Sequence, residues 1–226
     1  MRNPWLQIPL AEYEGHMALP QVAQAQLLGN VFESMLEKYR PRSVAVLGCA
    51  GGNGFERIRN TVTTRVIGVD LNPDYIKELG TRFKDRLPTL ELYVGDVQTG
   101  EVTFRPVDLV FAGLVLEYLD VNTVLMRILS LLNPGGILST VVQLPSPTSA
   151  AVTPSPFLSI QALEPFMHLV APVRLKHVAE RYGYLEDAAR LEESYGGKQF
   201  QVQTFRLLTP NLAVNADAPQ AARRLP

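Results

Sequence analysis

Hydrophobic and polar positions along the chain follow two alternating patterns. Short and nearly continuous apolar runs, such as residues 44–47, are typical of strands buried on both faces of a parallel sheet. The segments between them repeat apolar residues every three or four positions, which is typical of helices with one buried face. This alternation predicts a parallel sheet covered by helices on both faces. Its strands are expected at residues 44–48, 66–70, 90–94, 107–112 and 137–143.

The last apolar runs of the chain come as a pair. Residues 184–194 and 198–208 are separated by Gly196 and Gly197, a spacing that predicts an antiparallel hairpin. The predicted fold is therefore an α/β, doubly wound, mostly parallel seven-stranded sheet with helices on both faces and an antiparallel C-terminal hairpin.

Three helices have recognisable start signals. Pro20 is expected to open the first of them, and Pro41 to end it. Asn72 is expected to cap the second, with Pro73 at its first helical position. Asp120 can cap the third, which then turns its apolar residues inward.

The chain divides into three parts along its length. Residues 1–19 are apolar in places but have no clean period, so we expect an irregular arm that folds over the carboxyl edge of the sheet as a lid. Residues 20–209 are expected to form one domain, and residues 210–226 a disordered tail. Within the domain, the Pro-rich segment 145–156 is expected to be an irregular loop that forms the wall of the site opposite the arm. Broken helices are expected after it and end at Gly183.

Composition limits the classes of partner. The 226 residues carry a formal net charge of -1, which gives no electrostatic reason to expect nucleic acid or an anionic membrane. The apolar stretch 107–119 is interrupted by Asp108 and Glu117 and is too short to span a bilayer. The N-terminal residues do not resemble a signal peptide, and Cys49 is the only cysteine, so a cytoplasmic location is expected. The sequence does not indicate an oligomeric state.

A cluster of small residues follows the first predicted strand. Glycine permits sharp turns and lets a ligand approach the backbone closely. Asn53 is expected to cap a helix directly after the cluster, with Glu56 three positions later, which places a helix N-terminus beside any bound ligand. Neither the dinucleotide pattern G-x-G-x-x-G nor the P-loop pattern fits. The remaining pattern places small residues at Gly48, Ala50, Gly52 and Gly54.

That spacing resembles the first motif of class I, Rossmann-like, S-adenosylmethionine-dependent methyltransferases of the small-molecule type, and later landmarks of the family follow in order. Asp70 ends the second predicted strand, where nucleotide-binding α/β proteins hold ribose hydroxyls. Asp96 follows the third and resembles the family's adenine-contacting acid. Residues 107–114 resemble its fourth strand and cofactor loop, and residues 132–138 the turn before its fifth.

The resemblance implies S-adenosylmethionine as the cofactor and a small molecule as the methyl acceptor. It also implies a set of residues at the carboxyl ends of the strands that contact the cofactor. These are Gly48, Cys49, Ala50, Gly51, Gly52, Gly54, Asp70, Leu71, Asp96, Val97, Ala112, Gly113 and Leu114.

Catalytic groups are less clearly indicated, because a sulfonium methyl group is already activated and mainly requires alignment and exclusion of water. His16, Glu117 and Tyr118 are the candidate catalytic residues, and each has an alternative interpretation as a packing or surface residue. Tyr13, Glu14 and Gln143 are the candidate acceptor contacts. We expect no metal, because no cluster has metal-ligand spacing. The motif of DNA amino-group methyltransferases is missing after the fourth strand, where residues 112–115 stand.

Two other functions are compatible with the sequence. The chain could bind S-adenosylmethionine as a non-catalytic or partner module. It could also be a nicotinamide-dependent oxidoreductase, although the failed dinucleotide pattern and the second acid at Asp96 argue against that class.

Overall fold

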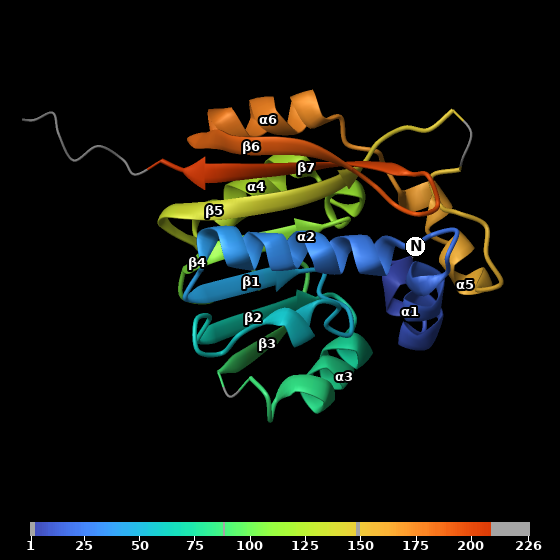
Figure 1. The fold of residues 1–226 in the computed structure, drawn as a ribbon, viewed down its shortest axis with the longest axis horizontal. Coiled ribbons are helices and arrows are strands. Elements are labelled where there is room, and N and C mark those ends of the chain that lie inside the picture. Colours follow the sequence, from blue (N-terminus) through green and yellow to red (C-terminus); the bar gives the residue numbers. More distant parts are fainter. Residues whose placement is uncertain (1–2, 88, 148–149, 209–226) are drawn as a thin grey trace, which may run out of the picture.

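A seven-stranded sheet forms the centre of the computed structural model, which describes residues 3–87, 89–147 and 150–208 (Figure 1). The strand order is β3-β2-β1-β4-β5-β7-β6. The first five strands pair in parallel, and β7 runs antiparallel to both β5 and β6. The predicted fold class is therefore confirmed, whereas the predicted tail lies outside the described residues. The strands are β1 Ser43–Leu47, β2 Arg65–Asp70, β3 Leu90–Val94, β4 Val107–Gly113, β5 Leu132–Gln143, β6 Tyr184–Glu193 and β7 Gln199–Leu207.

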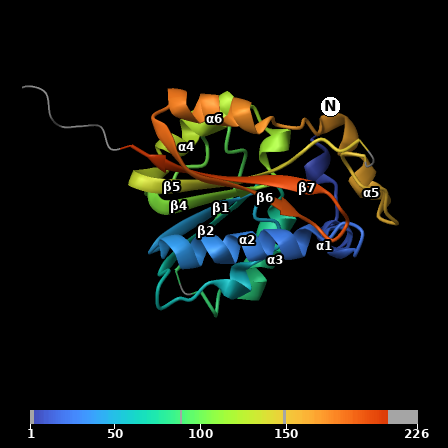
Figure 2. The same ribbon diagram turned by 45° about the horizontal axis from the view of Figure 1, so that its top comes forward.

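Helices cover both faces of the sheet, as Figure 2 shows. One face packs against α2 (Gln24–Tyr39) and α3 (Pro73–Phe83), and the other against α4 (Val121–Leu129) and α6 (Pro172–Arg181). Each face has its own apolar cluster, because the strands are buried on both sides. This double burial explains why the strands appear in the sequence as continuous apolar runs.

Two of the predicted helix caps are confirmed. The side-chain oxygen of Asn72 accepts a hydrogen bond from the backbone N–H of Asp74 at 2.9 Å. The carboxylate of Asp120 accepts one from the backbone N–H of Thr123 at 2.8 Å. Each cap satisfies an N–H group that the first helical turn leaves without a partner, which fixes where α3 and α4 begin.

The prediction of an irregular N-terminal arm is wrong. Pro4–Leu6 form a 3-10 helix and Leu10–Ala18 form α1, with Pro9 at its N-cap position. Leu10, Tyr13 and Met17 follow a helical spacing that the surrounding polar residues obscure. The next helix also begins later than Pro20. Its first residue is Gln24, because the chain turns through the left-handed conformation of Ala23, with a φ of 47°, before α2 starts.

The prediction of a helix directly after the glycine cluster is also wrong. Only a 3-10 turn at Phe55–Arg57 follows the cluster, and Gly54 rather than Asn53 stands at its N-cap position. The amide of Asn53 instead donates a hydrogen bond to the carbonyl oxygen of Ala25 at 3.0 Å, which ties the loop to α2. The glycine loop therefore offers no long helix N-terminus to a ligand.

Segment boundaries differ from the prediction in two further places. β5 begins at Leu132, which pairs with Val107, and residues 133–136 bulge out before Ile137 pairs with Leu109. After β5, the broken helical region consists of α5 (Leu158–Gln161), a 3-10 helix at Glu164–Phe166 and α6. Pro172 is the first residue of α6, since proline is well placed in a first helical turn.

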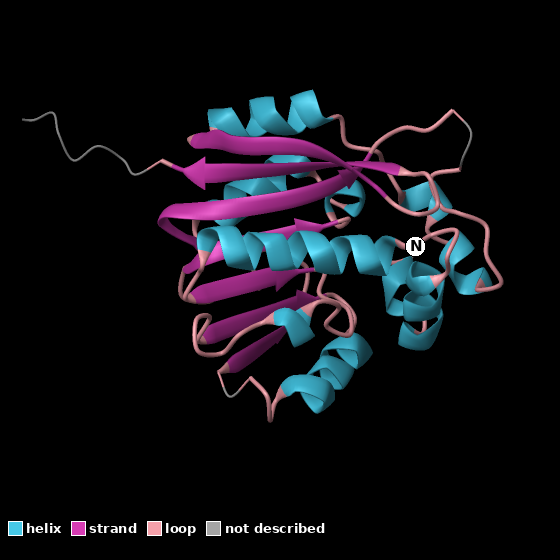
Figure 3. Ribbon diagram, viewed as in Figure 1, coloured by secondary structure: helices cyan, strands magenta, loops and turns pink. Residues whose placement is uncertain are grey.

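A third apolar cluster lies beyond the carboxyl ends of the parallel strands. Its buried members are Ile8 from the arm and Val152, Ile160 and Leu163 from the segment after β5. We call residues 3–18 and 150–167 together the cap. Figure 3 shows their helices, α1 and α5, next to each other at the strand tips. Full burial of one aliphatic side chain is worth about 1.5–3 kcal/mol, so burial of these four residues stabilises the packing of the two parts of the cap against each other.

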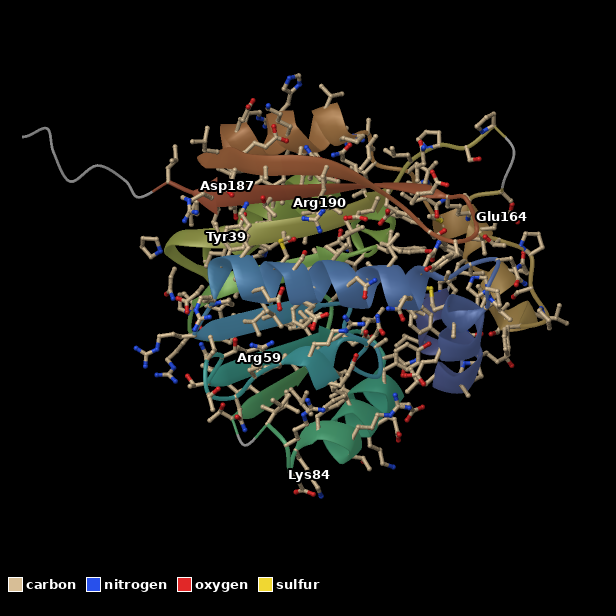
Figure 4. All side chains as sticks on the ribbon, viewed as in Figure 1. Tyr39, Arg59, Lys84, Glu164, Asp187 and Arg190 are labelled. Carbon is tan, nitrogen blue, oxygen red and sulfur yellow. The ribbon has the colours of Figure 1, made fainter. Side chains whose placement is uncertain are left out.

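At the other end of the molecule, α2 is fastened to the edge strand β6. The Tyr39 hydroxyl donates to the Asp187 carboxylate at 2.6 Å, and the Lys38 ammonium donates to the same carboxylate at 2.9 Å. Figure 4 shows Tyr39 and Asp187 at the side opposite the cap. These contacts hold the pKa of Asp187 at about 2, chiefly through the Tyr39 hydrogen bond, so the carboxylate stays charged at physiological pH.

Candidate active site

A cleft opens where the carboxyl ends of β1, β2 and β4 meet, with about 770 Å³ of free space. We call it the strand-end cleft. Ligands of open α/β sheets bind at this edge, because the strand order reverses there and leaves a crevice. In this sheet the reversal lies between β1 and β4. Of the predicted cofactor contacts, those that line the cleft are Gly48, Ala50, Asp70, Leu71, Asp96, Val97, Gly113 and Leu114.

Asp70 organises the floor of the strand-end cleft. One of its carboxylate oxygens accepts a hydrogen bond from the backbone N–H of Ala50 at 2.8 Å, and the other accepts one from Asn72 at 2.9 Å. The first bond holds the loop after β1 in a conformation in which Gly48 and Ala50 have φ values of 66° and 45°. Burial raises the pKa of Asp70, and the backbone donors oppose that rise.

Asp96 forms the second acidic position of the cleft, after β3. Its carboxylate accepts a hydrogen bond from the backbone N–H of Gln98 at 2.9 Å. The side-chain oxygen of Gln98 in turn accepts from the backbone N–H of Asp120 at 2.7 Å, which joins this loop to the start of α4. Asp96 and Gln98 both line the cleft and add polar atoms to its wall.

Three aromatic side chains and Leu114 line the strand-end cleft and also a neighbouring cavity. Trp5 meets Tyr118 edge-on at 5.0 Å between ring centroids, and meets Tyr13 at 5.7 Å. Tyr13 also stacks on Tyr75 at 6.1 Å. The Tyr75 hydroxyl donates to the carbonyl oxygen of Ile8, so α3 holds the arm directly. We call Trp5, Tyr13, Leu114 and Tyr118 the shared wall.

The neighbouring cavity has about 500 Å³ of free space and lies between α1, the end of β5 and the cap residues after β5. We call it the arm-side pocket. His16 lines it, and the imidazole Nδ1 is hydrogen-bonded to the Ser155 hydroxyl at 2.9 Å. Burial, and then the charge of Lys198, lower the pKa of His16, so the ring is neutral at physiological pH.

Gln143 is the polar residue at the centre of the pocket wall. Its backbone N–H donates to the Glu117 carboxylate at 2.7 Å, and its side-chain amide donates to the carbonyl oxygen of Ala151 at 3.1 Å. Glu117 itself is buried behind this wall and lines neither cavity. Burial raises its pKa to about 7. Glu117 therefore contacts the arm-side pocket only through Gln143, whereas Tyr118 lines both cavities.

Several predicted cofactor contacts do not reach the strand-end cleft. The glycine loop turns away after Ala50, so Gly52 packs against α3 and Gly54 against Phe32 of α2. Gly51 lies under the arm, beside Leu10 and Glu14. These contacts make the loop compact. The predicted cofactor contacts that do not line the strand-end cleft are Cys49, Gly51, Gly52, Gly54 and Ala112.

Glu14, a predicted acceptor contact, does not line the arm-side pocket. Its carboxylate pairs with the Arg82 guanidinium at 2.5 Å, on the outer side of α1, and lines neither cavity. The pair fastens the arm to α3. Helical geometry explains the difference, because Tyr13 points into the cavities and its neighbour Glu14 is turned about 100° away from it.

Three further residues at or beside the cavities carry no sequence signal. Trp5 and Gln98 both line the strand-end cleft, although no motif points to either of them. Lys198 gave no signal, because a lysine beside two glycines suggests an exposed turn. In the structure it is 3% exposed.

Within residues 3–87, 89–147 and 150–208, no group of three His, Cys, Asp or Glu side chains could hold a metal ion. No helix in this part of the chain is long and apolar enough to cross a bilayer.

Comparison with protein families gives a match over residues 44–136 to a family described as a methyltransferase domain. The chain is 36% identical over 107 residues to a trans-aconitate 2-methyltransferase of Methylobacterium radiotolerans, covering 46% of this chain and 38% of the relative. It thus spans about two fifths of the length of the curated relatives it matches. The predicted resemblance to methyltransferases is confirmed in this region.

Solved structures share the fold. A possible exported protein of Bordetella parapertussis is 20% identical with a TM-score of 0.64, over 84% of this chain and 70% of that chain. A 1,6-didemethyltoxoflavin-N1-methyltransferase of Burkholderia thailandensis is 15% identical with a TM-score of 0.63, over 88% of this chain and 84% of that chain. At these identities the likeness shows the fold alone.

Proposed function

We propose that this chain is an S-adenosylmethionine-dependent methyltransferase that acts on an O, N or C nucleophile of a small molecule. The observation that carries the proposal is the pair of adjoining cavities at the strand ends, which have the shared wall between them. One cavity has the features of a nucleotide site and the other is enclosed by the cap. The family match over residues 44–136 supports the same activity.

The strand-end cleft fits an adenosyl cofactor. Each carboxylate oxygen of Asp70 accepts one backbone hydrogen bond and retains a lone pair that can accept from a ribose hydroxyl. Asp96 and Gln98 offer polar atoms for an adenine edge, and Leu71 and Val97 offer apolar surface for its faces.

When bound, the cofactor supplies a methyl group whose carbon takes a lone pair from the acceptor while the electrons of the carbon–sulfur bond return to sulfur. The chain has to align the acceptor and exclude water. In this proposal the cap, which lies over the carboxyl ends of the strands, shields the reaction from water, and the shared wall separates the cofactor from the rest of the arm-side pocket. Neutral His16 can take the proton of an acceptor O–H or N–H, with Ser155 orienting the ring.

The acceptor is expected to occupy the arm-side pocket. Because one relative is described as a trans-aconitate 2-methyltransferase, trans-aconitate comes first in an acceptor screen. The proposal includes a cytoplasmic location, supported by the single cysteine, and no nucleic-acid partner, supported by the net charge of -1.

The test has two stages. Calorimetry with S-adenosylmethionine, S-adenosylhomocysteine and NAD should show binding of the first two and not of NAD. A screen of small acceptors should then show release of S-adenosylhomocysteine. Binding of NAD alone would favour a nicotinamide-dependent oxidoreductase, and cofactor binding without turnover on any acceptor would favour a non-catalytic module.

Asp70→Ala should weaken S-adenosylmethionine binding by about 1–3 kcal/mol, because it removes the acceptor for the ribose hydroxyls and for the Ala50 N–H. Calorimetry measures the change, and thermal unfolding shows that the fold is retained. Asp74→Ala is the matched control, since Asp74 is exposed on α3 and lines neither cavity. Equal affinity in Asp70→Ala and the control would remove Asp70 from the cofactor site.

A further inference from the structure

Lys198 is a buried cation without a carboxylate partner among the described residues. It directly precedes β7, and only 3% of its surface is exposed. The ammonium donates to the carbonyl oxygen of Ala151 at 2.6 Å and to the side-chain oxygen of Gln143 at 3.5 Å. Both of these acceptors are neutral, and no ion pair within the described ranges includes Lys198.

The ammonium group of Lys198 lies directly behind the wall of the arm-side pocket. Lys198 does not itself line the pocket, but its two hydrogen-bond partners, Gln143 and Ala151, both do. His16 lines the pocket as well, and the Lys198 charge contributes to the lowered pKa of its imidazole. The positive charge therefore lies next to the cavity, one residue layer from its surface.

A second polar group of the same pocket lacks a partner. The Thr153 hydroxyl oxygen is buried and makes no hydrogen bond, although Thr153 lines the arm-side pocket. A buried hydroxyl without a partner is costly, and native proteins rarely leave one unless a ligand or water satisfies it. A hydroxyl donor without a partner thus lines the cavity, and a cation without a carboxylate partner among the described residues lies behind two of its lining residues.

A purely structural tie would not require this charge. A neutral donor could hold the Ala151 carbonyl to the hairpin without the large penalty of taking an ammonium out of water. That penalty lowers the pKa of Lys198 to about 8, so the side chain is still mostly protonated at neutral pH. An anion in the pocket would offset the penalty, since opposite charges in a low-dielectric site attract strongly.

We propose that the arm-side pocket recognises an acceptor that carries a carboxylate group, with Lys198 as the residue that pairs with it and Thr153 as an additional donor. This inference rests on the proposed function, because it names the class of acceptor for that reaction. An acceptor that also reacts through a carboxylate oxygen needs no general base, since that oxygen is already deprotonated at neutral pH.

Measurements of ligand binding test the proposal and do not require methyl transfer. Succinate, benzoate and tricarballylate are each titrated beside their neutral methyl esters into the protein, with and without S-adenosylhomocysteine. The wild type should bind at least one acid about tenfold or more tightly than its ester, as expected for a charge-assisted hydrogen bond. Lys198→Met should remove that preference, and Lys198→Arg should restore part of it. Lys176→Met is the matched control, because Lys176 pairs with Glu186 at the surface and lines neither cavity.

Two results would overturn the proposal. One is an unchanged preference for acids in Lys198→Met, and the other is a wild type that binds no acid better than its ester. If Lys198→Met does not fold, Thr153→Val provides the same comparison and should lower acid binding about 3- to 10-fold while leaving ester binding unchanged. Loss of S-adenosylhomocysteine binding by the wild type would instead contradict the proposed function, while the carboxylate titrations would still report on Lys198.

Discussion

Ala50 holds a left-handed backbone conformation at the edge of the strand-end cleft, with a φ of 45°. A residue with a Cβ atom is strained there, by about 1–2 kcal/mol, whereas glycine adopts this conformation freely. The bond from the Ala50 N–H to Asp70 holds the strained conformation in place. Strain kept at a cleft is typical of a functional site, where the precise position of the backbone matters more than stability.

Ala50→Gly should therefore stabilise the protein by about 0.5–1 kcal/mol, the strain relieved less the added entropy of the unfolded chain. Urea unfolding measures the difference. Ala45→Gly is the matched control: Ala45 lies inside β1 and is fully buried, so the same change should destabilise there. A loss of stability in Ala50→Gly would show that the loop is not strained at this position.

Glu117 gives the stability a pH dependence with a defined sign. Its pKa rises from 4.5 to about 7 in the folded protein, because the carboxyl group is buried. Between these values the folded state holds a proton that the unfolded state has released, so stability falls as pH rises from 4.5 through 7. Across this pH range the free energy of unfolding falls by about 3 kcal/mol.

Glu117→Gln should remove this dependence and keep the acceptor for the Gln143 N–H. The variant should gain stability over the wild type at pH 8 and gain little at pH 5. Urea unfolding at the two pH values measures both differences. An equal change at both pH values would contradict a raised pKa for Glu117.

Residues that form part of local patterns were predictable. Asn72, Asp120 and the acids at the strand ends follow from cap signals and chain order, and the structure places Asp70 and Asp96 at the strand-end cleft. The burial of Lys198 was not predictable, because it depends on Ala151 and Gln143, which are 47 and 55 residues away in the chain. No local pattern encodes a contact of that kind.

At the scale of elements, the cap depends on a close contact between α1 and α5. A Cβ atom at Gly15 would overlap the Phe157 ring, so glycine lets the two segments approach. Ser159 adds a polar tie, since its hydroxyl donates to the Glu12 carboxylate at 2.6 Å. The helical character of α1 was not predictable, because polar residues interrupt its narrow apolar face.

Gly15→Ala should separate α1 from α5 and loosen the cap. Backbone amides of residues 150–167 should then exchange hydrogen faster, while those of β1 and β4 stay unchanged. In a Phe157→Ala background the same substitution should have little effect, because the overlap is gone. Equal exchange in Gly15→Ala and the wild type would show that the contact does not control the cap.

At the scale of the whole molecule, the two cavities draw on different parts of the chain. The family match ends at residue 136 and includes the strand ends that floor the cleft. The arm-side pocket is built largely from residues outside that range, from α1 and from the segment after β5. The sequence predicted the first cavity better, because its residues follow an ordered series of strands, whereas the second depends on distant segments that meet only in three dimensions.

Deletion of residues 1–18 should leave the sheet folded, because the two large apolar clusters take only Met17 and the partly buried Tyr13 from this segment. It should weaken S-adenosylmethionine binding, since Trp5 and Tyr13 are lost from the shared wall. Circular dichroism and calorimetry measure the two effects. Loss of cooperative unfolding would show that the arm belongs to the folded core.

Trp5 is the single tryptophan of the chain, and it lies in the shared wall against Tyr118 and Tyr13. Indole emission is sensitive to the polarity around the ring, and here all of it comes from the boundary between the two cavities. Emission excited at wavelengths that indole absorbs and tyrosine does not is therefore a local signal. A ligand that enters either cavity changes the surroundings of this one chromophore, which makes the protein its own optical sensor of site occupancy.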